Sequence, residues 1–206
     1  AYYERSFDKG NLYWWVGAGP EYFWTTDYLE NDSGFGIYAE AGIGYIPEDR
    51  HRRGMIMSSP LWENAMLGHQ TREPFAKGLW IDRRGARRRT EEILETYDVR
   101  APGVDVAGYA LSGGNQQKLI VGRELTAGAR VLLANHPTRG VDVGAQAAVW
   151  DHLREARGAG LAVLLVSADL EELIGLSDSL LVMLRGRIVA RLDPATVTPE
   201  ELGSYM

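Results

Sequence analysis

Residues 42–206 alternate between short apolar runs and longer amphipathic stretches. The apolar runs at 130–134, 162–166 and 179–184 have the length of β-strands, and they are continuous rather than alternating with polar residues. Continuous apolar strands separated by helices are typical of a parallel sheet that is covered on both faces. We therefore expect an α/β fold in which a parallel sheet is flanked by helices.

The amphipathic stretches predict the flanking helices. In the first of them, Ile93, Leu94 and Tyr97 lie on one side and the arginines lie on the other. A short strand is expected at 44–47, and a glycine turn at Gly186 separates the last apolar run from a final strand at 187–190. The helices are expected at 82–97, 114–125, 144–157 and 169–176.

Residues 1–41 differ in composition from the rest of the chain. They contain twelve of the 20 aromatic residues and a net charge of −5, whereas all 206 residues sum to −6. Turn-forming residues separate short β segments at 11–17, 21–26 and 36–46. We expect two parts, an aromatic β-hairpin-like segment at 1–41 and an α/β domain at 42–206.

Composition narrows the classes of site and partner. The absence of cysteine excludes disulfides and thiolate metal sites. His51, His69 and His152 are isolated and lack the spacing of metal ligands, so we expect no metal site. Neither part is basic enough for nucleic-acid binding. The apolar runs are far shorter than the roughly 20 residues that span a bilayer, so no direct membrane insertion is expected.

The most informative motif is a glycine pair between a serine and a helix. Glycines allow the backbone to approach an anion closely, and the start of the helix directs N–H groups and a positive dipole end at the same point. The segment therefore predicts a phosphate cradle. The residues that we assign to it are Leu111, Ser112, Gly113, Gly114, Asn115 and Gln116.

Three further segments stand in order around this motif. An apolar strand at 131–134 is followed by NHPTRGVDVG at 135–144. A second strand and helix start follow at 163–173, and GYIPEDRHRRG lies upstream at 44–54. In this order and spacing, LSGGNQQ and its neighbours resemble the signature, Walker B, D-loop, H-loop and Q-loop segments of ABC transporter ATPases. The wording is most similar to the second ATP-binding domain of two-domain simple-sugar or nucleoside importers.

This resemblance implies a truncated P-loop NTPase-like sheet and a role in ATP-driven uptake of sugars or nucleosides. In the family, the signature contacts ATP bound by the opposite domain, which also holds the Mg²⁺, and the D-loop and Q-loop positions here are Asp142 and Glu48. The implied partners are a P-loop-bearing ABC domain and membrane permease subunits. The implied location is cytoplasmic, peripheral at the inner face of the cell membrane.

The chain departs from the family in the elements that serve its own nucleotide site. The Walker A pattern GxxxxGK[ST] occurs nowhere in the 206 residues. Asn135 stands at the Walker B aspartate position, His136 at the catalytic glutamate position, Ala168 at the H-loop position and Glu48 at the Q-loop glutamine position. We therefore expect no autonomous hydrolysis, while the elements that act on a partner's ATP are retained.

Several interpretations stay open from sequence alone. The chain is a signature-donating half-domain, a non-catalytic fusion or truncated product, or a hydrolase that uses His136. We expect 1–41 to cover part of an unpaired sheet edge. In the helix at 83–95, arginines and glutamates are spaced to form ion pairs, so we expect that helix face to be exposed to solvent. The resemblance places permease docking within 55–80, which includes Trp62, Phe75 and Trp80.

Overall fold

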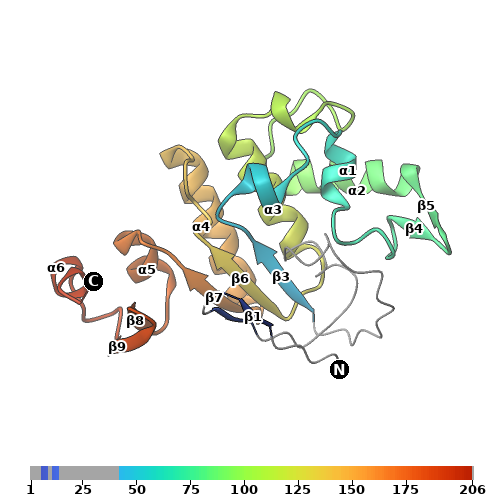
Figure 1. Cartoon of the computed structure of the whole chain (residues 1–206). Helices are drawn as coiled ribbons and strands as arrows, with labels where there is room; N and C mark the ends of the chain where they lie inside the picture. The colour runs from blue at the N-terminus through green and yellow to red at the C-terminus, as the bar shows by residue number, and fades with distance from the viewer. Residues whose placement is uncertain (1–5, 9–10, 14–41, 206) are drawn as a thin grey trace.

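A three-stranded parallel sheet lies at the centre of the domain (Figure 1). The computed structural model describes residues 6–8, 11–13 and 42–205. The sheet order is β3-β6-β7, from β3 (Ile43–Ile46), β6 (Val131–Asn135) and β7 (Ala162–Val166). Both pairs of neighbours are parallel. The predicted parallel sheet is confirmed, and the apolar strands at 131–134 and 162–166 are neighbours in it, with β7 at the edge of the described sheet.

Two long helices cover one face of this sheet, α3 (Gly113–Leu125) and α4 (Val143–Gly158) (Figure 1). Ile46, Leu132 and Val149 are each 0% exposed and share one core cluster. Apolar side chains removed from water in this way supply the main driving force for folding. The core therefore fixes the sheet against the helices whose first residues carry the candidate site.

The helices begin where the sequence supplies a capping side chain. α2 (Arg83–Thr96) and α5 (Leu170–Leu176) join α3 and α4 as predicted helices, each within one or two residues of its expected bounds. An oxygen at the N-cap accepts backbone N–H groups that have no partner within the helix. The four caps are Asp82, Ser112, Asp142 and Asp169.

The segment between β3 and α3 contains short elements that the apolar pattern does not predict. Part of this segment packs in a second buried cluster that includes Trp62, Phe75 and Ala86. The shortness of the elements explains the omission, since two to five residues carry no periodicity. The elements are η3 (Arg50–Gly54), α1 (Leu61–Ala65), β4 (Ala76–Lys77), β5 (Trp80–Ile81) and η4 (Gly108–Ala110).

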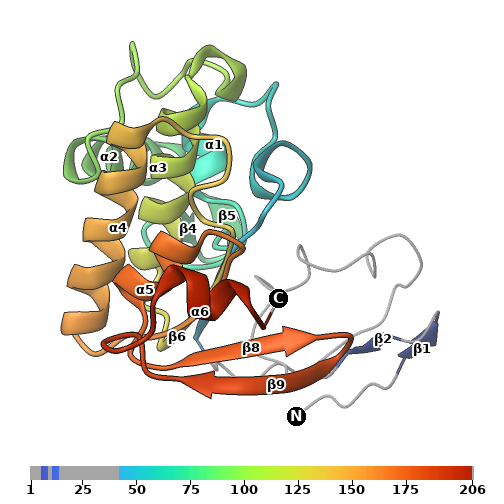
Figure 2. The same cartoon turned by 90° about the vertical axis from the view of Figure 1, so that its left-hand side faces the viewer.

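The C-terminal strands form a hairpin of their own, beneath the helix α6 (Pro199–Gly203) (Figure 2). β8 (Leu180–Leu184) pairs antiparallel with β9 (Arg187–Leu192), so the expectation that the 179–184 strand extends the parallel sheet is wrong. Arg185 and Gly186 have φ of 50° and 76°. Two consecutive positive φ angles reverse the chain tightly, which directs β9 back onto β8.

Only two short strands of the N-terminal segment are described. β1 (Ser6–Asp8) pairs antiparallel with β2 (Asn11–Tyr13), which lies within the strand expected at 11–17. The segments expected at 21–26 and 36–41, and the covering of a sheet edge by 1–41, lie outside the described residues. The division at residue 42 stays a prediction.

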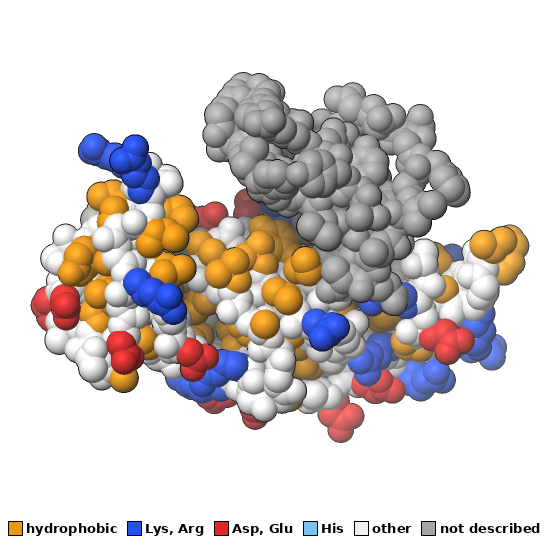
Figure 3. Space-filling view, turned by 90° about the horizontal axis from the view of Figure 1, so that it is seen from below, with side chains coloured by type: hydrophobic (Ala, Val, Ile, Leu, Met, Phe, Trp, Pro, Cys, Tyr) orange, Lys and Arg blue, Asp and Glu red, His pale blue; other side chains and the backbone are white. Residues whose placement is uncertain are grey.

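Apolar side chains remain exposed along the strands on the far side of the sheet (Figure 3). Val163 and Leu165 of β7 pack against the core, so the alternating Leu164 and Val166 point away from it and are 59% and 44% exposed. Met183 of β8 is 68% exposed. Among the described residues, no helix combines the length and apolar character that crossing a membrane requires.

Candidate functional site

The signature segment turns from η4 into α3 at Ser112. The Ser112 hydroxyl accepts from the backbone N of Asn115 at 3.4 Å and from its side-chain Nδ2 at 3.0 Å. The Asn115 side-chain oxygen in turn accepts from the backbone N of Arg100 at 2.9 Å. Leu111 is buried, whereas Ser112 is exposed. The serine is therefore held at the surface by its own cap while the residue before it anchors the turn in the core.

Gln116 connects this turn to the segment after β3. Its side chain is 4% exposed. The amide nitrogen donates to the carbonyls of Gly108 and Leu111, and the amide oxygen accepts from Arg50 Nε at 3.3 Å. The His51 ring nitrogen Nε2 lies 2.9 Å from the same oxygen. Gln116 thus positions the loop from within.

Arg50 joins the signature to the loop after β6. Its Nη1 donates to the carbonyl of Arg139 at 2.8 Å, and its Nη2 donates to the carbonyl of Gly140 at 3.2 Å. An ion pair between Arg139 and Glu48 closes the same bridge from the other side. A planar guanidinium is suited to several simultaneous acceptors. Arg50 therefore ties three segments together that lie far apart in the chain.

The glycine pair is required by close packing rather than by unusual φ angles. A Cβ atom at Gly113 would lie 2.8 Å from Arg50 Nη2. A Cβ atom at Gly114 would lie 2.7 Å from the Ala145 Cβ and 3.1 Å from Asp142 Oδ2. All three separations are shorter than an ordinary van der Waals contact. Gly114 is thus explained by the approach of α4, whereas the contact at Gly113 involves the flexible end of the Arg50 side chain.

Asp142 caps α4 next to the signature. Its carboxylate accepts the backbone N–H of Ala145 at 2.9 Å, and this hydrogen bond lowers the pKa of Asp142. The residue is exposed, and its second oxygen adjoins the signature, since a Cβ atom at Gly114 would lie 3.1 Å from it. The structure brings Asp142 and the signature glycines together, as the sequence-based assignment requires.

Asn135 and His136 end β6 beside the end of β7. Asn135 is paired in register with Val166, and the backbone N of His136 donates to the Val166 carbonyl at 2.7 Å. His136 has a φ of 48°, a left-handed conformation that is uncommon for a non-glycine residue. Ala168 follows β7 and is exposed. The three altered positions therefore lie at one edge of the sheet.

Glu172 holds this edge together, although sequence reasoning did not single it out. Its Oε1 accepts from the Thr138 hydroxyl at 2.7 Å and from Trp150 Nε1 at 3.1 Å. The side chain is only 1% exposed. Trp150 packs against the core and is also a hydrogen-bond donor. Arg50 and Glu172 were missed because their partners are separated from them by tens of residues.

A cavity of about 160 Å³ lies elsewhere, at the C-terminal end of α3. Arg72 donates to the carbonyl of Ala127 and Arg89 to that of Thr126, so both cations cap the helix end. Burial lowers the pKa of His69 to about 4, and within the described chain neither ring nitrogen has a hydrogen-bond partner. Because these two arginines donate to carbonyl groups at the end of α3, we interpret the cavity as part of the helix cap rather than as a binding site.

The parallel sheet flanked by helices, the glycine pair at a helix start and the strand-end loop beside it define an α/β domain. Its fold is that of an ATP-binding cassette. The dimeric cassette MJ0796, solved in a post-hydrolysis state bound to ADP and Pi, matches with a TM-score of 0.62 and 20% identity, over 74% of this chain and 62% of that chain. No family model matches the sequence.

Relatives in sequence are import proteins. The chain is 42% identical over 167 residues to the guanosine import ATP-binding protein NupO of Bacillus subtilis (strain 168), covering 81% of this chain and 33% of NupO. It is 39% identical over 162 residues to the ribose import ATP-binding protein RbsA 1 of Streptomyces avermitilis, covering 79% and 31%. The chain is thus a relative of nucleoside and ribose import ATP-binding proteins, and it matches their C-terminal part.

The nucleoside import ATP-binding protein NupA of Lactococcus lactis subsp. cremoris is similar at the same level, with 38% identity over 167 residues that cover 81% of this chain and 33% of NupA. The chain spans about a third of the length of these relatives. The resemblance stated from the motifs is confirmed by these matches.

Proposed function

We propose that the chain supplies its signature segment to ATP held by a P-loop outside these 206 residues, and so supports ATP-driven import of nucleosides or sugars. The observation that carries this proposal is the bracing of Ser112 and the glycine pair between Arg50 and Asp142. A braced, exposed cradle is suited to meet an anion presented by another domain. The substrate class comes from guanosine import by NupO and ribose import by RbsA 1, as their names state.

The chemistry follows from the start of α3. The N–H groups of Gly113 and Gly114 lie in the first turn, where an α-helix offers no internal acceptor. Together with the helix dipole they favour negative charge, such as that of a γ-phosphate. Ser112 adds a hydroxyl, and Asn115 and Gln116 fix the loop. The partner's P-loop would hold the Mg²⁺, and Asp142 and Glu48 would line the same interface.

The chain's own strand-end residues do not fit a hydrolytic site. A neutral Asn135 amide cannot offset the charge of Mg²⁺ as a carboxylate does. His136 has no second catalytic group beside it in the described structure, and Ala168 has no polar side chain. We therefore propose that ATP acts only in trans and that the isolated chain does not turn over ATP.

The surfaces of the domain support assembly with other domains. Exposed Leu164, Val166 and Met183 provide an apolar strand face on which the rest of a cassette would pack. Of the residues that the sequence suggested for permease docking, Trp62 and Phe75 are each only 7% exposed. Their burial makes them unsuitable for contact with a permease. The permease would hold the chain at the cytoplasmic face of the membrane.

The test is ATPase activity of a P-loop-bearing import domain, measured alone and with the chain. We expect the chain to stimulate the rate roughly 10²–10³-fold. This is the rate change that follows from removing one hydrogen-bond donor from an oxyanion hole. Ser112→Arg should abolish it by blocking the cradle, whereas His136→Ala should leave it intact. Equal stimulation by wild type and Ser112→Arg would overturn the proposal and leave a purely structural role. If the isolated chain turned over ATP and His136→Ala abolished this turnover, the hydrolase interpretation would be supported instead.

A further inference from the structure

The β4–β5 hairpin ends in apolar side chains that nothing in the described structure covers. Leu79 is 100% exposed, Trp80 is 80% exposed and Ile81 is 49% exposed. The tip projects from the end of the domain, away from the sheet and from the start of α3 (Figure 1). A largely exposed Leu–Trp pair lowers solubility and adds little to the core. We therefore expect the tip to contact a binding partner.

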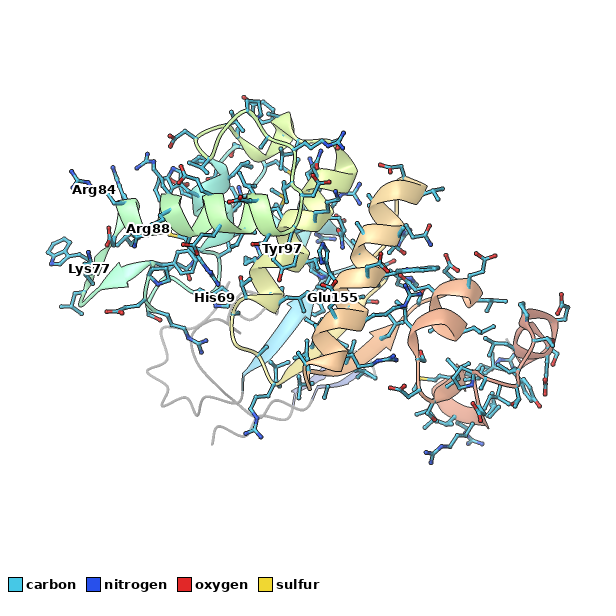
Figure 4. All side chains as sticks on the ribbon, turned by 180° about the vertical axis from the view of Figure 1, so that it is seen from behind. His69, Lys77, Arg84, Arg88, Tyr97 and Glu155 are labelled. Carbon is cyan, nitrogen blue, oxygen red and sulfur yellow. The ribbon has the colours of Figure 1, made fainter. Side chains whose placement is uncertain are left out.

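Positive charge surrounds this tip. Six basic residues and one acid lie between residues 77 and 90, in a chain whose net charge is −6. Figure 4 shows Lys77, Arg84 and Arg88 at the same end of the molecule, beside the hairpin. Arg84 and Arg88 are one helical turn apart and so share a face of α2. The cations are concentrated where the apolar side chains protrude.

The expected Arg–Glu pairing of α2 accounts for only part of this charge. Arg89 pairs with Glu92 at 2.9 Å, and Arg87 pairs with Asp105 at 2.8 Å while stacking over Trp62. Within the described residues, no ion pair involves the exposed arginines 83, 84 and 88. The expected Arg–Glu pairing is therefore found at Arg89, and the solvated face of α2 keeps three arginines for which the described structure shows no ion pair.

We propose that the hairpin tip and these three arginines form a contact with the surface of an anionic phospholipid bilayer. Tryptophan favours the boundary between headgroups and acyl chains, and a leucine beside it adds apolar area that the boundary can bury. Basic residues next to such a wedge are attracted by anionic headgroups. Because the rest of the chain has a negative net charge, this end would be attracted most strongly, which would orient the domain.

The test is cosedimentation of the full 206-residue chain with phosphatidylglycerol-containing vesicles and with phosphatidylcholine vesicles. We expect binding to the anionic vesicles alone, weakened by salt. A triple variant Arg83→Gln, Arg84→Gln, Arg88→Gln should lose about a hundredfold in partitioning, or about fivefold per cation. Leu79→Ser with Trp80→Ser should lose about tenfold or more.

Matched controls separate a local contact from a general charge effect. Arg52→Gln, Arg53→Gln, Arg187→Gln removes the same charge from exposed positions elsewhere and should change partitioning less than about threefold, because salt screens distant charges. A blue shift of tryptophan emission on anionic vesicles should disappear in Trp80→Phe. Cooperative urea unfolding of each variant confirms that it is folded.

Two results would overturn the proposal. One is equal vesicle binding by the wild type and the hairpin variants. The other is no binding to lipid alone together with tip-dependent binding to membranes that contain a permease, which would make the hairpin a protein contact. The vesicle assay uses neither nucleotide nor a P-loop domain, so its outcome is independent of the signature function.

Discussion

The guanidinium of Arg50 donates from Nε to the side-chain oxygen of Gln116 at 3.3 Å, so the segment after β3 is fastened directly to the helix that begins with the signature. The same guanidinium reaches two carbonyls of the loop after β6. The geometry of the signature turn therefore depends on a residue outside the signature itself.

Replacing Arg50 tests this dependence. Arg50→Ala should lower the free energy of unfolding by about 1–2 kcal/mol, because it removes charge-assisted hydrogen bonds to Gln116 and to the 139–140 carbonyls. Arg50→Lys should recover less than half of the loss, since an ammonium cannot match the planar fork. Urea unfolding measures both. Arg52→Ala, at an exposed neighbour, should stay within about 0.5 kcal/mol of wild type, and an equal loss there would contradict the assignment.

The packing of the glycine pair gives a second prediction. Gly114→Ala should destabilise the fold by about 1–3 kcal/mol, because the new methyl group would overlap Ala145. Gly158→Ala is the matched control, since its Cβ would meet nothing within 4 Å at the last residue of α4. That variant should be stabilised by about 0.4–1 kcal/mol. Similar unfolding curves for the two variants would refute the packing argument.

His69 predicts a pH dependence. Burial, together with Arg123 and Arg72, lowers its pKa to about 4 against the opposing effect of Glu124. In the unfolded chain His69 is protonated near pH 6.5, whereas in the folded chain it is protonated only near pH 4. The free energy of unfolding should therefore fall as the pH drops from about 6.5 to about 4. The loss should be roughly 3 kcal/mol.

The measurement is the difference in unfolding free energy between wild type and His69→Gln from pH 7.5 to pH 4. Carboxylates titrate in both proteins and largely cancel in the difference. The wild type should lose stability relative to the variant on acidification. Parallel curves would show that His69 does not titrate as a buried neutral imidazole.

Glu172 predicts a contrast between two substitutions. Glu172→Ala should cost about 2–3 kcal/mol, because the buried donors of Thr138 and Trp150 lose their acceptor. Glu172→Gln retains that acceptor and removes a buried charge, so it should stay within about 1 kcal/mol of wild type. Thermal or urea unfolding distinguishes them, and equal losses would mean that the hydrogen bonds to Oε1 are not what the side chain provides.

Local signals account for what the sequence predicted correctly. The starts of α2 and α5 follow from the capping residues Asp82 and Asp169, and the strands at 131–134 and 162–166 follow from their uninterrupted apolar residues. The signature was recognised because its glycines and serine are adjacent in the chain. Each of these features is decided within a few residues.

Long-range relationships account for what the sequence did not predict. The role of Arg50 depends on carbonyls at 139–140, and that of Glu172 depends on Thr138. The pairing of β8 with β9 was decided by a two-residue turn, while their apolar pattern equally suited a parallel sheet. Similarly, Arg87 forms an ion pair with Asp105 rather than with a glutamate of its own helix, which helical spacing alone does not predict.

The register of the central sheet has a consequence for how the chain reaches this structure. Ile43 pairs with Val131, whereas Val131 pairs with Ala162 after only one intervening helix. Contacts between distant segments form slowly, because a long loop must close before they contribute. The β6–α4–β7 unit is therefore expected to assemble early in folding, and β3 to join it late. The cradle, whose bracing by Arg50 comes with β3, would then be completed among the last features of the fold.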